Sequence, residues 1–238
     1  MTNFPPFLTI IDPVIGFLFG YTKSLITLQK LRINMKKFGD HIHFIPGKGQ
    51  NSNSILIKDK TIAVIDPGLP DNTHLIKELH DLGVEPDDVA IVINTEPHVD
   101  HTGANILFPN AKLIGSKETA RALEYADPKV TAATAFGIKL KKCRFTKKVE
   151  GGDVLSFGKT KLTVIETPGH TAGNISLYEE KLRLLICGDL VFSENIGRTD
   201  LPTGNAEALY ESLKRLSTLD IDIILPGHGP FCYKESIL

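Results

Sequence analysis

The sequence predicts an α/β protein that forms one compact unit after Met35. Strand-like apolar runs alternate with helical runs, and no low-complexity linker or clear internal repeat divides the chain. A length of 238 residues suits one domain with an appendage better than two full domains. The 42% hydrophobic and 23% charged residues are typical of a globular protein, so a disordered or collagen-like chain is excluded.

The first part of this unit predicts four strands and one helix. Apolar residues at helical spacing from Leu75 to Leu82 indicate a helix, which Asp71 or Asn72 can cap and Gly83 can end. The strand-like runs, bounded by Gly and Pro, lie at 41–46, 54–58, 62–66 and 89–94. The last of these is continuously apolar, as expected of a strand covered on both faces.

The second part of the unit again favours strands, with two further helices. One helix is expected from Ser116 to Tyr125, and another around Leu209, Leu213 and Leu216, capped near Asn205. The stretch from 126 to 140 could form a pocket wall or lid, or ordinary surface. Strands are expected at 112–115, 161–166, 174–178, 182–187 and 221–225.

Residues 1–34 form a separate feature. They are strongly apolar between Phe4 and Gly20, but Pro13 and Asp12 interrupt the run, and no basic region or cleavage site brackets it. We therefore expect no stable membrane insertion. An appendage outside the core, or an alternative start at Met35, is the favoured hypothesis; a peripheral membrane or oligomerisation arm ranks lower. The domain proper is expected at 35–238, and its oligomeric state is not predicted.

Charge and cysteine content bound the partners and the compartment. The 27 basic and 28 acidic residues nearly cancel, and no basic stretch is interleaved with aromatic residues, so a small-molecule substrate is expected and no nucleic acid. Cys143, Cys187 and Cys232 are odd in number and widely spaced, which indicates neither a disulfide framework nor a thiolate zinc site. A reducing, cytoplasmic location fits this pattern.

Histidine and carboxylate residues gather in four loops that follow apolar strands. The alternation in Glu96-Pro97-His98-Val99-Asp100 predicts an extended segment with three ligands on one side, and a helical turn follows at His101. Rigid strand ends can hold the roughly seven ligands of a site with two ions about 3.5–4 Å apart. The candidate metal ligands are Glu96, His98, Asp100, His101, His170, Asp189 and His228.

Four other histidines have simpler interpretations. His41 and His43 alternate on the first strand and are expected at the surface rather than in a metal site. His74 and His80 lie among polar neighbours of an amphipathic helix and are expected to face solvent.

These motifs resemble those of the metallo-β-lactamase superfamily from Met35 to Gly229. Its H-x-H-x-D-H motif corresponds to the segment from Glu96 to His101, and its three later ligands correspond to His170, Asp189 and His228. The resemblance implies a four-layer αββα sandwich. Asp66, in an early D-x-G turn, would support the ligands from behind. The loop from Gly197 to Pro202 is similar to that of the glyoxalase II-like group, and its Arg198 and Asp200 are expected to form a structural ion pair.

The resemblance also implies how two divalent ions would be shared. One would bind Glu96, His98 and His170, the other Asp100, His101 and His228, with Asp189 between them. Glu96 is the departure, because the family usually has histidine there. With two divalent ions, three carboxylates and one hydroxide, the site becomes neutral and less Lewis acidic. Zinc is the expected metal, with iron or manganese favoured at the oxygen-rich Glu96 site; alternatively, Glu96 swings away and a single ion binds.

A dinuclear site of this kind would hydrolyse an ester-like bond. The resemblance implies that a bridging hydroxide attacks a thioester carbonyl and that Asp100 takes part in proton handling. Full-length glyoxalase II has a C-terminal helical region that recognises glutathione, whereas this sequence stops ten residues after His228, so glutathione selectivity is not expected.

Two rival functions remain open at this stage. A mononuclear iron persulfide dioxygenase shares the fold, but its iron site would need a histidine at the position of Glu96. A metal-binding scaffold or sensor without turnover is the non-enzymatic rival. It ranks lower because six of the seven ligand positions carry the residue types of the family pattern.

Overall fold

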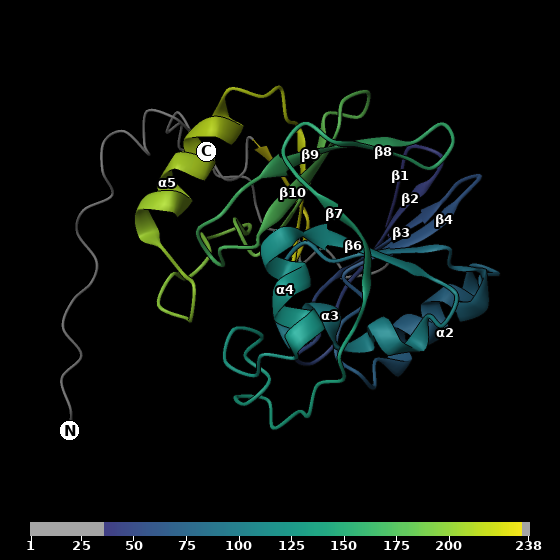
Figure 1. Cartoon of the computed structure of the whole chain (residues 1–238). Helices are drawn as coiled ribbons and strands as arrows, with labels where there is room; N and C mark the ends of the chain where they lie inside the picture. The colour runs from purple at the N-terminus through teal and green to yellow at the C-terminus, as the bar shows by residue number, and fades with distance from the viewer. Residues whose placement is uncertain (1–35, 235–238) are drawn as a thin grey trace, which may run out of the picture.

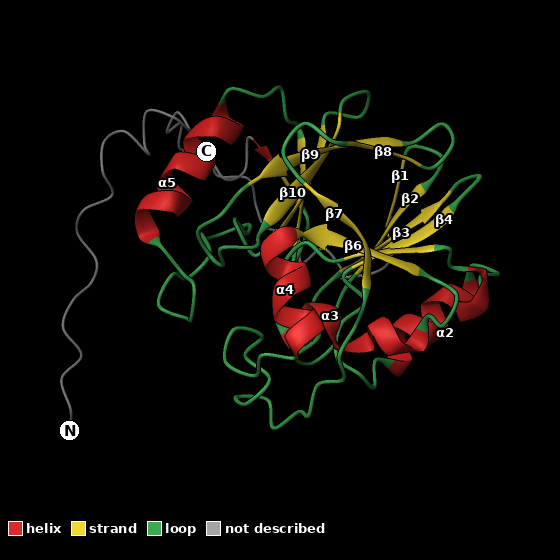
Figure 2. Cartoon of the chain, in the orientation of Figure 1, coloured by secondary structure: helices red, strands yellow, loops and turns green. Residues whose placement is uncertain are grey.

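The computed structural model describes residues 36–234 and confirms the predicted α/β sandwich. Two β-sheets face one another and carry helices on their outer sides, so the layers run helix, sheet, sheet, helix (Figures 1 and 2). The expectations for residues 1–34 lie outside the described residues. Within the described part, no helix is both long enough and apolar enough to span a bilayer.

The first sheet contains seven strands in chain order. They are β1 (Lys36–Phe38), β2 (Ile42–Ile45), β3 (Ser54–Lys58), β4 (Ile62–Ile65), β5 (Ile91–Ile93), β6 (Lys112–Ser116) and β7 (Phe145–Val149). Pairing is antiparallel from β1 to β4 and parallel from β4 to β7. Because β4 and β5 are parallel neighbours, the loops that begin at Asp66 and Asn94 leave the same edge of the sheet.

The second sheet contains six strands in the order β13-β12-β11-β10-β9-β8. They are β8 (Val154–Ser156), β9 (Lys161–Glu166), β10 (Ile175–Glu179), β11 (Leu184–Gly188), β12 (Ile223–Pro226) and β13 (Cys232–Tyr233). β11 and β12 are parallel, whereas the other pairs are antiparallel. The parallel pair brings the loops after Gly188 and Pro226 to one edge, beside the loop that joins β9 to β10.

The main hydrophobic core lies between the two sheets. Ile55 and Ile57 of β3 face this core, whereas Leu56 points the other way into the layer of helices. This alternation explains why the three central residues of β3 are all apolar: both faces of the strand are covered there. Burial of each such side chain contributes about 1.5–3 kcal/mol to folding.

Three amphipathic helices cover the outer faces, each capped by a polar side chain. They are α2 (Thr73–Asp81), α4 (Lys117–Tyr125) and α5 (Ala206–Ser217). The Asn72 side chain accepts a hydrogen bond from the Leu75 amide, and Ser116 and Asn205 cap α4 and α5 in the same way. α2 and α4 pack on the first sheet and α5 packs on the second (Figure 1). The short helices are η1 (Pro86–Asp88), α3 (Val99–Thr102) and η2 (Gly103–Leu107).

Four strands escaped the sequence-based prediction, and one of them, β1, is only three residues long. β7 buries only its two end residues, so it lacks the alternation that marks a half-buried strand. β8 and β13 are only three and two residues long. Their pairing is set by neighbouring strands rather than by their own composition.

The expected surface position is wrong for His43, which is 8% exposed. It alternates with Ile42 on β2 and shares the covered face of Leu56, its partner on β3. His80 is exposed as predicted, but His74 is largely covered, with 16% of its side chain exposed beside Glu78.

The segment from 126 to 140 packs against α3 at a few points, although most of its residues are exposed or half-buried. Ala133 is fully buried against Leu69 and Val99, and the Val99 amide donates a hydrogen bond to the Thr131 carbonyl. The segment therefore rests on the helical turn that follows His98.

Candidate metal centre

The loop after β5 presents four of the candidate ligands, but its local structure differs from the prediction. α3 begins at Val99, with His98 as its N-cap, so Asp100 lies on a helical turn rather than on an extended segment. The His101 and Thr102 amides donate hydrogen bonds to the His98 carbonyl, and these bonds close the turn. Side chains of adjacent helical residues point in directions about 100° apart. The turn therefore directs the Asp100 and His101 side chains differently, while both stay at the site.

The first ligand cluster consists of Glu96, His98 and His170. One ligand atom from each lies within 4.8 Å of the other two. His98 Nδ1 is 3.0 Å from Glu96 Oε2 and 3.1 Å from His170 Nε2. The Glu96 side chain is fully buried and points into the cluster. Its carboxylate is therefore placed where it can bind a cation.

The second cluster consists of Asp100, His101 and His228, and it has the same compactness. His228 Nε2 is 3.1 Å from Asp100 Oδ2. Asp189 lies between the clusters. Its Oδ2 is 3.7 Å from Nε2 of both His170 and His228, and its Oδ1 is 3.4 Å from Nε2 of His101. All seven predicted ligands thus meet around one space.

The donor atoms at this space fit divalent cations. Several buried atoms have no hydrogen-bond partner within the described chain: both oxygens of Glu96, Nε2 of His101 and Oδ1 of Asp189. Buried polar atoms without partners are costly, and a bound cation removes that cost. Three carboxylates and four imidazoles are also a suitable donor set for two such ions.

Asp66 contacts the His101 ring at Nδ1. Its Oδ2 lies 3.0 Å from His101 Nδ1 and accepts a 2.5 Å hydrogen bond from the Thr95 hydroxyl, while Oδ1 accepts one of 2.8 Å from the Thr95 amide. A proton on His101 Nδ1 leaves Nε2 free to bind a cation. Thr95 was missed by the sequence analysis, although it directly precedes the ligand motif.

His170 is oriented by a backbone carbonyl that the sequence did not reveal. Its Nδ1 lies 2.7 Å from the Arg198 carbonyl oxygen. The Arg198 side chain instead pairs with Asp200 through two hydrogen bonds of 2.7 and 2.6 Å, with both side chains mostly exposed. In this structure the ion pair shapes the loop and the backbone of that loop contacts the ligand.

Two glycines permit this close packing. A Cβ atom on Gly197 would lie 2.0 Å from the Asp189 carbonyl oxygen, and one on Gly227 would lie 2.1 Å from Asp189 Oδ1 and 2.7 Å from His101 Cε1. A side chain at either position would displace the ligands.

The charges in the site are strongly coupled. Burial opposes ionisation of Asp189, but the adjacent histidines outweigh burial and hold the pKa of that carboxyl below its usual range. Burial likewise opposes protonation of His101, yet Asp189 and Glu96 raise its pKa well above 6.5. A proton on His101 therefore offsets part of the carboxylate charge in the metal-free protein, and a cation would replace that proton.

Comparison with known proteins gives the class. The Metallo-beta-lactamase superfamily matches residues 47–228, so this chain belongs to that superfamily. A probable metallo-hydrolase of Methanocaldococcus jannaschii is 37% identical over 194 residues, covering 77% of this chain and 90% of the relative. The hydroxyacylglutathione hydrolase GloC of Haemophilus influenzae is 30% identical over 203 residues, covering 80% and 92%. Membership in this superfamily supports a metal-dependent hydrolase.

Solved structures agree with the fold. The chain matches TTHA1623 in a di-iron-bound form at 28% identity with a TM-score of 0.68, covering 80% of this chain and 94% of that one. It matches the B3 metallo-β-lactamase BLEG-1 at 25% identity with a TM-score of 0.71, covering 82% and 95%.

Proposed function

We propose that this protein is a hydrolase that uses two divalent metal ions to cleave a thioester or a related ester-like bond in a small molecule. The observation that carries the proposal is the meeting of seven ligand side chains in two compact clusters joined by Asp189. The 30% identity with a hydroxyacylglutathione hydrolase supports the thioester class.

We further propose iron or manganese at the cluster that contains Glu96. The Glu96 carboxylate is a harder ligand than the histidine it replaces, and harder ligands favour these metals over zinc. The di-iron form of TTHA1623 supports this choice, since that protein shares 28% of its residues with this chain. Both Glu96 oxygens face the ligand cluster without a hydrogen-bond partner in the described chain, which supports a role as a ligand.

Two bound cations would supply Lewis acidity, which lowers the pKa of water and polarises a carbonyl group. The protein residues would then orient the reactants. Asp100 is only slightly exposed and its carboxylate lies at the edge of the second cluster, 3.1 Å from His228 Nε2, so it would be placed to accept a proton from water. Asp189 and His101 would help to hold the two clusters together, because Asp189 lies within 4 Å of His101, His170 and His228.

We propose a cytoplasmic location, which the state of the thiols supports. Cys143, Cys187 and Cys232 are all free, and the last two are buried. Burial strongly raises the pKa of the Cys187 thiol and raises that of Cys232 to about 12, so both stay protonated and unreactive. Free thiols support the cytoplasm as the location.

The test combines metal analysis with a substrate panel. Anaerobically purified protein is assayed for metal content and for hydrolysis of glutathione thioesters, simple thioesters, lactones and persulfides. We expect iron or manganese in the protein and activity on thioesters, with an Asp100→Asn variant losing at least about 100-fold in kcat, as for loss of a general base. Two zinc ions with negligible iron or manganese would refute the metal assignment. Equal inactivity of the metal-loaded wild type and variant would refute the hydrolase.

A further inference from the structure

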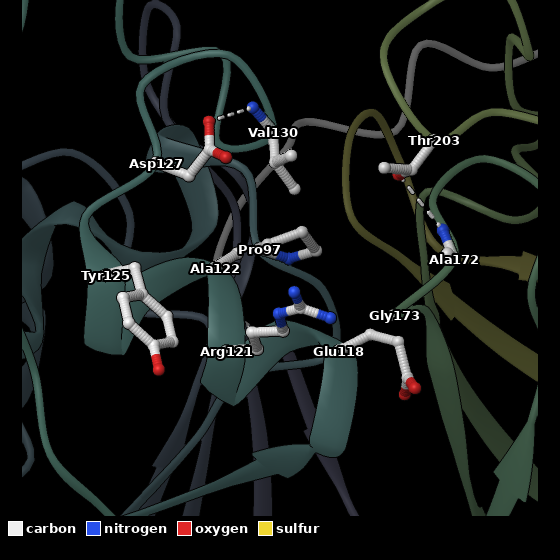
Figure 3. A pocket seen from close by; sticks show the side chains of 10 residues that line it. All are labelled: Pro97, Glu118, Arg121, Ala122, Tyr125, Asp127, Val130, Ala172, Gly173 and Thr203. Carbon is white, nitrogen blue, oxygen red and sulfur yellow. Dashed lines mark hydrogen bonds between the residues drawn. The ribbon is translucent and has the colours of Figure 1, made fainter.

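A pocket of about 420 Å³ lies between α4, the segment around Val130 and the loop that carries His170 (Figure 3). Its walls are largely apolar, with Pro97, Ala122 and Val130 among the lining residues. The sequence analysis did not identify this pocket, because its residues come from four separate segments.

The pocket shares two loops with the ligand clusters. Pro97 lines the pocket and lies between Glu96 and His98 in the sequence, and Ala172 lines it two residues after His170. The lining residue Gly173 is fixed to α4, because its carbonyl accepts hydrogen bonds from the Ser116 and Thr119 hydroxyls at 2.8 and 3.0 Å. The pocket therefore lies beside the two loops that carry Glu96, His98 and His170.

Arg121 is the distinctive charged group of the pocket. Figure 3 shows its guanidinium group near the middle of the lining side chains, close to Pro97 in this view, while the Glu118 carboxylate points elsewhere. Among the residues of the described chain, no carboxylate oxygen lies within 4.0 Å of the Arg121 guanidinium nitrogens, so Arg121 forms no ion pair there. Asp127 also lines the pocket, and its Oδ1 accepts hydrogen bonds from the Lys129 and Val130 amides rather than from Arg121.

We infer that Arg121 selects substrates that carry a carboxylate at the end remote from the scissile bond. A guanidinium group binds a carboxylate through two parallel hydrogen bonds, and the apolar walls suit the alkyl chain that leads to it. The inference rests on the proposed function, because the scissile bond is placed at the metal centre. The carboxylate could belong to the acyl half or to the thiol half of a thioester, and both offer Arg121 the same chemistry.

Three matched thioesters separate these sources. The hexanoyl thioester of 2-mercaptoethanol is neutral, the adipoyl monothioester of 2-mercaptoethanol carries a carboxylate on the acyl half, and the hexanoyl thioester of 3-mercaptopropionate carries one on the thiol half. Steady-state kinetics are measured for the metal-loaded wild type and for Arg121→Gln, Arg121→Lys and Arg144→Gln. Arg144 is an exposed arginine that does not line the pocket, so its variant controls for net charge.

We expect Arg121→Gln to raise KM about tenfold for one of the two anionic thioesters while kcat is kept. This is near the lower end of a charge-assisted hydrogen bond, because water reaches the exposed guanidinium group. The neutral thioester and the Arg144→Gln variant should show no change, and Arg121→Lys should retain part of the preference. Equal effects of Arg121→Gln on all three thioesters, or no effect, would overturn the inference.

A binding measurement keeps the inference testable if no thioester is hydrolysed. In that case the proposed function fails, and calorimetry compares a thioether carboxylate with its uncharged amide as probes. Tighter binding of the carboxylate to wild type, lost in Arg121→Gln, supports an anion-selective pocket. Equal binding of the two probes, or no binding of either, overturns it.

Discussion

Replacement of Asp66 by asparagine isolates the role of one carboxylate behind the metal centre. Asp66 has a φ of 51°, which asparagine tolerates well, and the two side chains have nearly the same shape. The substitution therefore changes hydrogen bonding rather than packing. In the native protein, one carboxylate oxygen accepts from the Thr95 amide and the other faces both the Thr95 hydroxyl and His101 Nδ1.

The expected magnitude follows from these contacts. If the asparagine oxygen stays with the Thr95 amide, its NH₂ group faces His101 Nδ1, which must then act as an acceptor. The ring proton moves to Nε2, the atom that lies 3.2 Å from Glu96 and 3.4 Å from Asp189 within the ligand clusters. Loss of such a supporting contact lowers metal affinity about 10- to 100-fold, which corresponds to about 1.4–2.7 kcal/mol. The opposite amide orientation leaves the Thr95 amide unpaired, at a cost of about 1–3 kcal/mol in folding stability.

The assay is a competition titration against a chromophoric chelator, together with denaturant unfolding of the metal-free protein. An Asp59→Asn variant is the matched control, since the Asp59 carboxylate also accepts two hydrogen bonds, here from the Lys60 and Thr160 amides, but lies outside the ligand clusters. We expect the control to bind metal normally. Wild-type affinity and stoichiometry in Asp66→Asn, with unchanged stability, would refute the reasoning.

Four further predictions follow from burial, charge and close packing. Neighbouring carboxylates raise the pKa of His101 above 6.5, so protons compete with cations for this ring below the raised pKa. Metal affinity should therefore increase as the pH rises from about 6.5. Calorimetry in two buffers should detect the protons that are released when the metal binds. In the metal-free protein the same shift stabilises the fold below about pH 6.5, and this contribution is lost as the pH rises through the raised pKa, as thermal unfolding can measure. Gly197→Ala should lower metal affinity, because its Cβ would meet the Asp189 carbonyl at 2.0 Å, whereas Gly151→Ala meets nothing closer than 3.7 Å and should bind normally. Leu79→Ala should lower the free energy of unfolding in denaturant by about 2–5 kcal/mol, because this side chain is fully buried on the inner face of α2.

The sequence was informative where local pattern and burial agree. The helix at Leu75 and Leu79 and the strand at 89–94 were predicted because their apolar spacing reflects the faces they bury. β7 was missed because three exposed residues in a row hide its period, and its place depends on pairing with β6.

The ligands of the candidate site were predicted from spacing and resemblance, but their supports were not. Thr95 and the Arg198 carbonyl act through contacts between distant segments, and a backbone carbonyl leaves no trace in the residue type. Arg121 was overlooked for a related reason: on α4 it has the spacing of an ordinary exposed residue, and only the fold places it in a pocket.

Each ligand cluster draws side chains from both sheets. Glu96 and His98 follow β5 in the first sheet, whereas His170 follows β9 in the second; Asp100 and His228 are divided in the same way. A cation in either cluster would therefore act as a cross-link between the two halves of the sandwich, closing a loop of more than 70 residues between His98 and His170. Metal loading should then resist mechanical separation of the sheets, so that under force the protein opens between its layers only after the cations are released.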